Sequence, residues 1–230
     1  MEQVPVGEIE MCGQRFCGDS AGALSWPAER ILVVADLHLE KGSSFARRGV
    51  LLPPYDSAAT LSNLAKVVDR YNPRMVIALG DSFHDGEGPQ RLSPADRGTL
   101  SALQRGRDWI WISGNHDPDP AADIGGVFCD CVSIGPFVFR HEPGANSDEN
   151  EIAGHLHPVA RVRVRGRTMS RKCFASDGRR MVMPAFGAYT GGLNVRDRAF
   201  AAIFGALGFT AHMVGATRLY AISAAYCLPD

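Results

Sequence analysis

Three apolar segments in the first half of the chain each end abruptly in polar residues whose side chains can bind metal ions. The segments are Ile31–Ala35, Met75–Leu79 and Trp109–Ile112, and they run into Asp36-Leu-His38, Gly80-Asp81 and Gly114-Asn115-His116-Asp117. Short continuous apolar runs rich in β-branched residues predict strands that are buried on both faces. This repeated pattern constrains the fold more than any other feature of the sequence.

Helical segments separate these strands. Apolar residues recur at close to helical spacing over Asp56–Tyr71, which Asn72-Pro73 ends, and a second helix is expected over Pro94–Arg105. Alternating strands and helices predict an α/β fold with a parallel sheet and right-handed crossovers. Ligand sites in such sheets lie outside the carboxyl ends of the strands, so the polar residues that follow the three strands should share one edge.

The rest of the chain is predicted to be mostly β-structure. Residues 1–30 contain two turn-like stretches and fit an opening hairpin packed on the main sheet. After residue 117, Gly/Pro-rich turns separate short apolar segments, as expected of a second, mostly antiparallel sheet. The expected strands are Val127–Val132, Phe137–Arg140, Glu151–Ala153, Val159–Arg165, Met181–Ala185 and Phe200–Phe204. We interpret residues 1–230 as one domain.

Composition excludes several classes of function. A formal net charge of -1 gives no global attraction to polyanions, so nucleic-acid binding would need a local basic surface. No segment approaches the about 18 apolar residues of a membrane span, and no export signal is present, so we expect a cytoplasmic protein with no membrane association. The six cysteines then stay reduced, and their spacing does not match a structural zinc site.

Six of the seven histidines lie directly after apolar segments: His38, His84, His116, His141, His155 and His157. One histidine in such a place is more often structural than a ligand. Six of them together with two aspartates would be buried polar groups without partners, unless they served a common site. Imidazole and carboxylate suit Mn²⁺, Fe²⁺ and Zn²⁺. In Asp36-Leu-His38 and His155-Leu-His157, a spacing of two on an extended backbone would place each pair on one side.

These segments resemble the metallophosphoesterase superfamily. The matching motifs stand in order as Asp36-Leu-His38, Gly80-Asp81-Ser-Phe-His84, Gly114-Asn115-His116-Asp117, His141 and Gly154-His155-Leu-His157. The resemblance implies a four-layer α/β/β/α sandwich, in which helices flank two mixed sheets. It also implies an enzyme with two divalent metal ions, most often Mn²⁺, with Fe²⁺ or Zn²⁺ as alternatives.

By this resemblance, metal one takes Asp36, His38, Asp81 and His157, and metal two takes Asp81, Asn115, His141 and His155. Two such ions activate a bridging hydroxide that attacks phosphorus in line with the leaving oxygen. His116 would protonate that oxygen, and His84 would orient His116. His84 stands where many superfamily phosphatases have an aspartate, and this departure favours the nuclease branch.

Within the superfamily, the segment Ala35–Gly42 and the ending Gly-His-Leu-His-Pro158 resemble the ligase-associated DNA damage response endonucleases, the PdeM family. That resemblance implies a repair-associated endonuclease or end-processing nuclease, with DNA as substrate and a functional link to a DNA ligase. A second hypothesis keeps the metal site but gives it a small nucleotide or other diester. A third hypothesis is a degenerate scaffold that only binds a protein. It predicts that metal-ligand residues have been replaced, but none of the motif positions is lost.

Two basic segments are candidates for contact with a nucleic-acid backbone. The first is Lys41–Arg48, which contains Arg47 and Arg48. The second runs from Arg161 to Arg180 and contains Lys172 and seven arginines, of which Arg161, Arg163 and Arg165 alternate with valines along an expected strand. Alternation places these three arginines on one face, directly after the last metal motif, where they could follow a phosphate backbone. A solvated outer face with the valines in the core explains the same pattern equally well.

Overall fold

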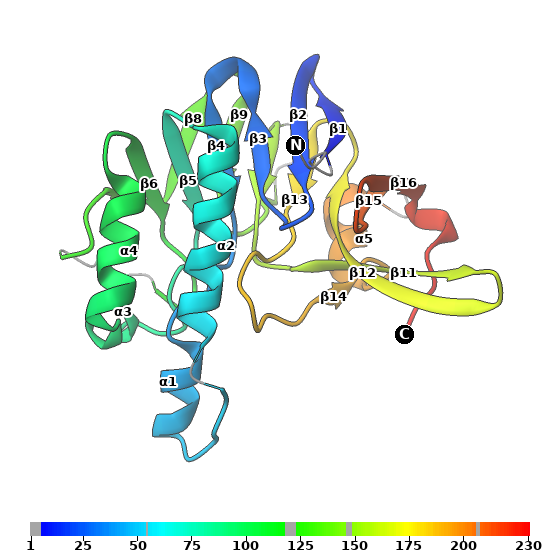
Figure 1. Ribbon diagram of the computed structural model, residues 1–230. Coiled ribbons are helices and arrows are strands. Elements are labelled where there is room, and N and C mark those ends of the chain that lie inside the picture. Colours follow the sequence, from blue (N-terminus) through cyan, green and yellow to red (C-terminus); the bar gives the residue numbers. More distant parts are fainter. Residues whose placement is uncertain (1–5, 54, 118–122, 146–148, 206–207) are drawn as a thin grey trace.

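The computed structural model describes residues 6–53, 55–117, 123–145, 149–205 and 208–230. Its backbone forms two mixed β-sheets with helices on both outer sides (Figure 1). The helices are α1 (Lys41–Arg47), α2 (Asp56–Tyr71), α3 (Gly88–Arg91), α4 (Pro94–Gln104) and α5 (Arg198–Phe204), with short 3-10 helices at Pro27–Glu29 and Ala224–Tyr226. No helix among the described residues is long and apolar enough to cross a membrane.

The first sheet has the strand order β1-β2-β3-β4-β5-β6-β7. Its members are β1 (Val6–Met11), β2 (Gln14–Asp19), β3 (Leu24–Trp26), β4 (Ile31–Val34), β5 (Met75–Leu79), β6 (Asp108–Ile112) and β7 (Val127–Cys129). Strands β4 to β7 are parallel, which confirms the predicted core of the sheet. The opening hairpin extends this sheet edge to edge, because β3 pairs with β4, and therefore does not pack on its face.

Capping residues and prolines determine where helix α4 begins and where helix α2 ends. The hydroxyl of Ser93 accepts a hydrogen bond from the backbone N–H of Asp96, which caps α4, and Pro94 occupies its first turn. Helix α2 ends at Asn72, which adopts a left-handed conformation directly before Pro73. The predicted bounds Asp56–Tyr71 are confirmed, and the buried face of α2 packs with α4 against the outer face of the first sheet.

The second sheet has the order β14-β11-β12-β13-β10-β9-β8, and β15 joins it beside β12 and carries β16. Its strands are β8 (Cys131–Ile134), β9 (Phe137–Arg140), β10 (Glu151–Ala153), β11 (Pro158–Val164), β12 (Arg167–Ser176), β13 (Arg180–Val182), β14 (Leu193–Asn194), β15 (Thr210–Val214) and β16 (Leu219–Ser223). The pairs β9–β10, β10–β13 and β11–β14 are parallel. The other five described pairs are antiparallel, so the sheet is mixed but mostly antiparallel, as predicted.

Two predicted strands were wrong. The segment Val127–Val132 is two strands, because the chain leaves the first sheet after Cys129 and enters the second at Cys131. Phe200–Phe204 lies in helix α5, where the carboxylate of Asp197 caps the first turn and Phe200 and Phe204, four residues apart, both face the core. A short apolar run does not distinguish a strand from a buried helical turn.

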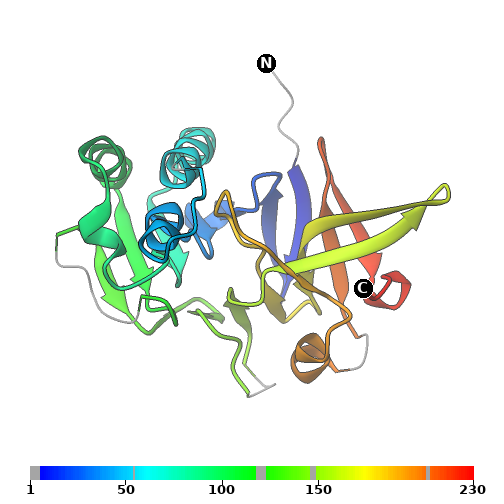
Figure 2. The ribbon, with the colours of Figure 1, turned by 90° about the horizontal axis from the view of Figure 1, so that it is seen from below.

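Three apolar cores separate the layers. One lies between α2, α4 and the first sheet, the second lies between the two sheets, and the third lies under α5 on the outer side of the second sheet. The middle core contains the rings of Phe16, Trp26 and Phe137, whose centroids are 5.2 to 5.6 Å apart. Figure 2 shows α2 and α4 on one side and α5 on the other. This four-layer α/β/β/α arrangement confirms the expected fold class.

Candidate metal centre

The loops after β4 and β5 hold the first candidate ligands side by side. The backbone N–H of His38 donates to the carbonyl oxygen of Asp81 at 2.9 Å, and Leu39 and Phe83 form an isolated parallel bridge. Parallel pairing thus continues past the ends of both strands. Because of this register, the side chains that follow β4 and β5 reach the same edge of the sheet, as the topology predicted.

Five candidate ligands have backbone conformations that are uncommon for residues other than glycine. Positive φ angles of 44° to 70° occur at Asp36, His38, Asp81, His155 and His157. The predicted extended backbone for Asp36-Leu-His38 and His155-Leu-His157 is therefore wrong. Left-handed positions cost of order 1 kcal/mol each and cluster at functional sites, where the surrounding structure fixes them.

Close backbone approach explains two glycines of the motifs. At Gly80, which has a φ of 69°, a Cβ would collide with the ring of His141. At Gly114 a Cβ would collide with the backbone nitrogen of Asp81. The motif glycines therefore let ligand-bearing segments from different strands touch.

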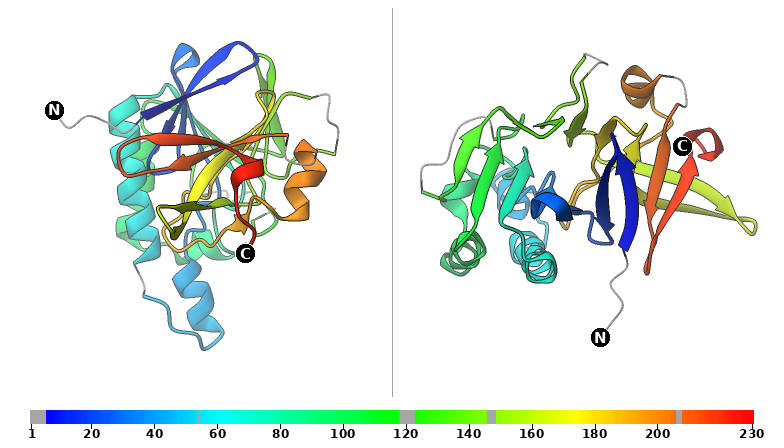
Figure 3. Two further views of the ribbon diagram at one scale, coloured as in Figure 1. Left: turned by 90° about the vertical axis from the view of Figure 1, so that its right-hand side faces the viewer. Right: turned by 90° about the horizontal axis from the view of Figure 1, so that it is seen from above.

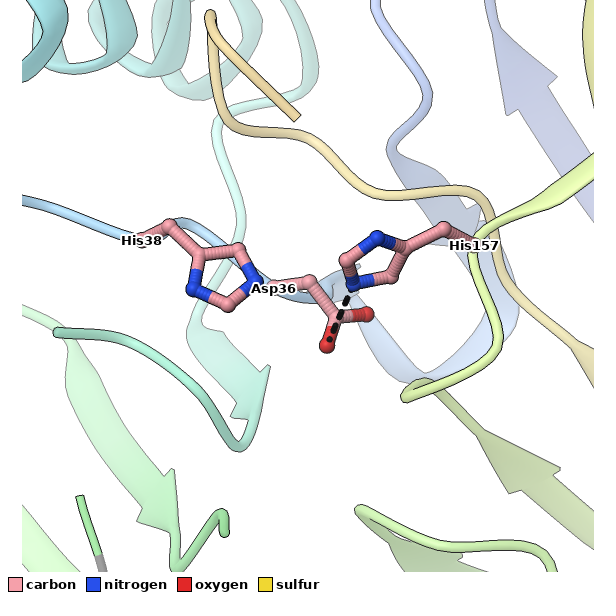
Figure 4. Close-up of side chains that lie close together, drawn as sticks. All are labelled: Asp36, His38 and His157. Carbon is pink, nitrogen blue, oxygen red and sulfur yellow. Dashed lines mark ion pairs between the residues drawn. The ribbon is translucent and has the colours of Figure 1, made fainter. Parts of the chain in front are cut away.

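The first cluster consists of Asp36, His38 and His157 (Figure 4), whose potential ligand atoms all lie within 4.8 Å of one another. Oδ1 of Asp36 is 3.2 Å from Nε2 of His157, and the carboxylate accepts hydrogen bonds from the backbone N–H of His155 at 3.1 and 3.2 Å. Asp36 is fully buried. Burial, reinforced by three neighbouring histidines, lowers the pKa of His38 to about 2, so its imidazole stays neutral, as metal binding requires.

The second cluster consists of Asp81, His141 and His155, again with all potential ligand atoms within 4.8 Å. Nδ1 of His141 lies 2.9 Å from the carbonyl oxygen of Leu79 at the end of β5, so that nitrogen carries the proton and Nε2 is free to accept. This Nε2 lies 3.5 Å from Oδ1 of Asp81 and 3.2 Å from Nδ1 of His155. Histidines from the second sheet thereby meet an aspartate from the first.

Asp81 lies between the two clusters. Its Oδ2 is 4.0 Å from Nε2 of His38, whereas its Oδ1 is the atom closest to His141. The backbone N–H of His116 also donates to Oδ1 at 2.9 Å, which fixes the carboxylate plane. A carboxylate whose two oxygens face different clusters fits the position of a shared ligand.

The donor atoms in both clusters fit divalent metal ions. Nδ1 of His38 is buried without a hydrogen-bond partner among the described residues, and among them the buried Nε2 of His157 is paired only with Oδ1 of Asp36, at an ion-pair distance of 3.2 Å. Buried polar atoms without partners are costly, and a cation would satisfy the nitrogen that faces it. Nitrogen and carboxylate oxygen without thiolate match Mn²⁺, Fe²⁺ or Zn²⁺. The two clusters are consistent with a dinuclear metal site.

Asn115 has an uncharged side chain and belongs to neither cluster of histidines and carboxylates, but it lies beside the second cluster. Its Nδ2 donates to Oε1 of Glu142 at 3.1 Å, and the same oxygen is 3.4 Å from Nε2 of His155. Glu142 was not among the predicted site residues. Its position directly after His141, a candidate ligand that ends β9, was the available signal.

The two predicted acid–base histidines lie against the first cluster. The rings of His84 and His116 are stacked with centroids 5.1 Å apart, and both are near His38. Nδ1 of His116 is 3.0 Å from the backbone oxygen of His84, and its Nε2 is 3.9 Å from Oδ2 of Asp81. Burial and the proximity of His116 lower the pKa of His84. His116 is the more exposed of the two.

The predicted substrate-binding arginines are spread over two regions. Arg47 and Arg48 line a hollow of about 500 Å³ beside α1, where Arg47 forms an ion pair with Glu87. Arg161 donates to the carbonyl oxygen of Pro229 near the C-terminal residues. Arg163 is exposed on β11, and Arg165 lies in the turn to β12 with a φ of 50°. Val164 is 48% exposed, so the alternation of valines does not mark a core face at this end of the strand.

Comparison with known proteins identifies the family. The model of the calcineurin-like phosphoesterase family matches residues 29–168, which is more than half of the chain. The chain belongs to this family. It is accordingly a metallophosphoesterase, a hydrolase with two candidate metal sites.

The chain is also similar to solved structures. It matches the crystal structure of Pseudomonas putida nuclease MPE at 28% identity and a TM-score of 0.72, over 94% of this chain and all of that one. A match to Yfce, a phosphoesterase from E. coli, has 11% identity and a TM-score of 0.40, over 84% of this chain and 98% of that one. The latter is too distant to support an argument. No curated protein matches.

Proposed function

We propose that this metallophosphoesterase hydrolyses phosphodiester bonds in DNA. The similarity to a nuclease over the full length of that chain carries the choice of substrate. The presence of His84 where many superfamily phosphatases have an aspartate, and the resemblance to the PdeM family, support the same assignment. That resemblance also supports Mn²⁺ as the metal, action at DNA damage, a functional link to a DNA ligase and a place in the cytoplasm.

Two ions are proposed to share Asp81. Metal one would be held by Asp36, His38, Asp81 and His157, and metal two by Asp81, Asn115, His141 and His155. When bound, the two ions would supply an activated water as nucleophile and would neutralise charge on the phosphoryl oxygens. The geometry that supports this assignment is the position of Asp81, whose two oxygens face His38 and His141.

His116 is proposed to protonate the leaving oxygen. The carbonyl of His84 holds the Nδ1–H of His116, so Nε2 is the atom that can carry and release the proton. His116 side-chain exposure of 47% allows it to reach a bound strand. His84, stacked on His116, restricts the rotation of that ring.

A small nucleotide or other diester is the second candidate, because the hollow of about 340 Å³ beside His157 has the volume of a small-ligand site. The dependence of the reaction on salt concentration distinguishes the two substrates. With purified protein and Mn²⁺, the KM for a single-stranded oligonucleotide should rise steeply with salt, whereas hydrolysis of bis(p-nitrophenyl) phosphate should change little. A protein that cleaves the small diester but leaves DNA intact at low salt would refute the proposed DNA substrate.

A further inference from the structure

A second hollow opens directly beside the candidate metal centre. It has a volume of about 340 Å³, and His157, a candidate ligand of metal one, forms part of its wall. The volume lies within the range of about 300–1,000 Å³ that is typical of small-ligand sites. A group bound here would be next to the reacting phosphate.

Pairing of β11 with β12 determines which cations lie near His157. Val159, two residues after His157, is opposite Lys172, and Ala160 is opposite Arg171. Arg163, by contrast, lies six residues after His157, about 20 Å along the projecting hairpin seen in Figure 3. The register therefore brings Lys172 to the hollow beside His157, together with Arg171, whereas Arg161, opposite Ser170, is hydrogen-bonded to the carbonyl oxygen of Pro229.

The positive charge of Lys172 is only partly offset, by the nearby carboxylate of Asp19. Its Nζ donates to the carbonyl oxygen of Ala21 at 2.5 Å, and among the described residues it forms no ion pair. The nearby carboxylate of Asp19 is fully buried and is already held by Arg70 at 2.5 Å and the hydroxyl of Tyr71 at 3.0 Å. An ammonium group has three donors, and Lys172, which lines the hollow, forms one hydrogen bond among the described residues.

The lining of this hollow suits a nucleotide phosphate and sugar. Ser170 and Thr190 contribute hydroxyl groups, and Val159 and Ala185 contribute apolar surface. Glycines form much of the opposite wall, where a Cβ at Gly191 would meet nothing within 4 Å. Among the residues that the structure describes, no carboxylate lines this hollow, whereas the hollow beside α1 contains Asp85 and Glu87. An anionic strand would be repelled less here.

We propose that the hollow between His157, Ser170 and Lys172 binds the nucleotide next to the scissile phosphate, with Lys172 and Ser170 contacting its flanking phosphate. This inference rests on the proposed function, because it presumes a polynucleotide substrate. Lys172 acts on strand binding alone and takes no part in bond cleavage.

The test compares Lys172→Met and Ser170→Trp with wild type on two substrates. The first variant removes the charge while retaining length, and the second fills the hollow from an exposed strand position. Each should raise the KM for single-stranded oligothymidylate about tenfold, since a hydrogen bond to a charged group is lost. Each should leave hydrolysis of bis(p-nitrophenyl) phosphate within about twofold, because that substrate has no flanking phosphate. Arg167→Ala, on the same strand but outside the hollow, is the matched control and should change neither.

Binding measured without turnover gives an independent readout. Fluorescence anisotropy with labelled oligothymidylate should show a salt slope reduced by about 0.7 in Lys172→Met, the value for one lost phosphate contact with a single strand. Unchanged affinity and slope in both variants would overturn the inference while leaving the phosphodiesterase assignment intact. Parallel loss of activity on both substrates would also overturn it, because the residues would then be structural. Failure of the wild type to cleave any DNA would instead refute the proposed function.

Discussion

Oε1 of Glu142 accepts a hydrogen bond from Nδ2 of Asn115 at 3.1 Å. This contact determines how the Asn115 amide is oriented, because an amide that donates through Nδ2 to Glu142 can direct Oδ1 elsewhere, toward metal two. The same carboxylate oxygen lies 3.4 Å from Nε2 of His155, which favours the tautomer with Nδ1 free. One exposed glutamate thus orients two of the proposed ligands of metal two.

Replacing Glu142 should weaken metal binding rather than abolish the fold. We expect Glu142→Ala to lower the affinity of one of the two metal sites by about 10–100-fold, the usual effect of losing a residue that orients ligands. Glu142→Gln retains a carbonyl acceptor for Asn115 and should have a smaller effect. Calorimetric titration with Mn²⁺ measures both. Unchanged affinity in Glu142→Ala would show that Asn115 and His155 need no such support.

The role of His116 predicts a dependence on the leaving group. His116→Ala should lower the turnover of DNA by about 10²–10⁴-fold, because an alkoxide leaves poorly without a proton. The loss should be much smaller for bis(p-nitrophenyl) phosphate, since a nitrophenolate is stable as an anion. Metal content, measured by mass spectrometry, should stay near the wild-type value, whereas Asp81→Asn should lower it. Equal losses on the two substrates would contradict an acid role for His116.

Stability should depend on pH through His212, on β15 away from the metal centre. Burial lowers its pKa from the usual value, so the unfolded chain binds the proton more tightly than the folded one. The folded protein therefore has its full stability above about pH 6.5 and loses stability as pH falls below that value toward the lowered pKa. His212→Gln removes this loss. Urea unfolding in the presence of chelator at about pH 7.5 and about pH 5.5 should show a smaller decrease in the variant.

The core between the two sheets should tolerate truncation poorly. Phe137 is fully buried and meets the rings of Phe16 and Trp26 edge-on at 5.4 and 5.6 Å. Phe137→Ala should cost about 3–5 kcal/mol of unfolding free energy. Val127→Ala, at a side chain that is 65% exposed, serves as the control and should change stability by less than about 0.5 kcal/mol. A similar cost for both would contradict the assignment of this core.

Much of the first sheet could be predicted from the sequence, because the apolar residues form continuous runs in the strands and recur at helical spacing in the helices between them. Residues Met75–Leu79 and Asp56–Tyr71 have the predicted bounds. Local periodicity carried less information in the second half. The pairing of β15 with β12 and the switch between sheets after Cys129 depend on contacts between distant segments, which a local pattern does not contain.

The side chains that meet at the centre could be predicted from topology, but their backbone conformation could not. Asp36 and His38 converge through left-handed positions, whereas the spacing of two suggested an extended chain. Tertiary hydrogen bonds, such as that from the N–H of His38 to Asp81, impose this conformation. The sequence placed Lys172 in a basic segment, but its position opposite Val159, near His157, follows from the register of the hairpin, which a local pattern does not contain.

The most direct test of the account is the position of metal ions around Asp81. Crystals grown with Mn²⁺ and measured at a wavelength near the manganese absorption edge should give two anomalous peaks about 3.5–4 Å apart. One carboxylate oxygen of Asp81 should bind each ion, with His38 and His157 on the first and His141 and His155 on the second. A single peak, or two ions of which only one contacts Asp81, would contradict a shared two-metal site.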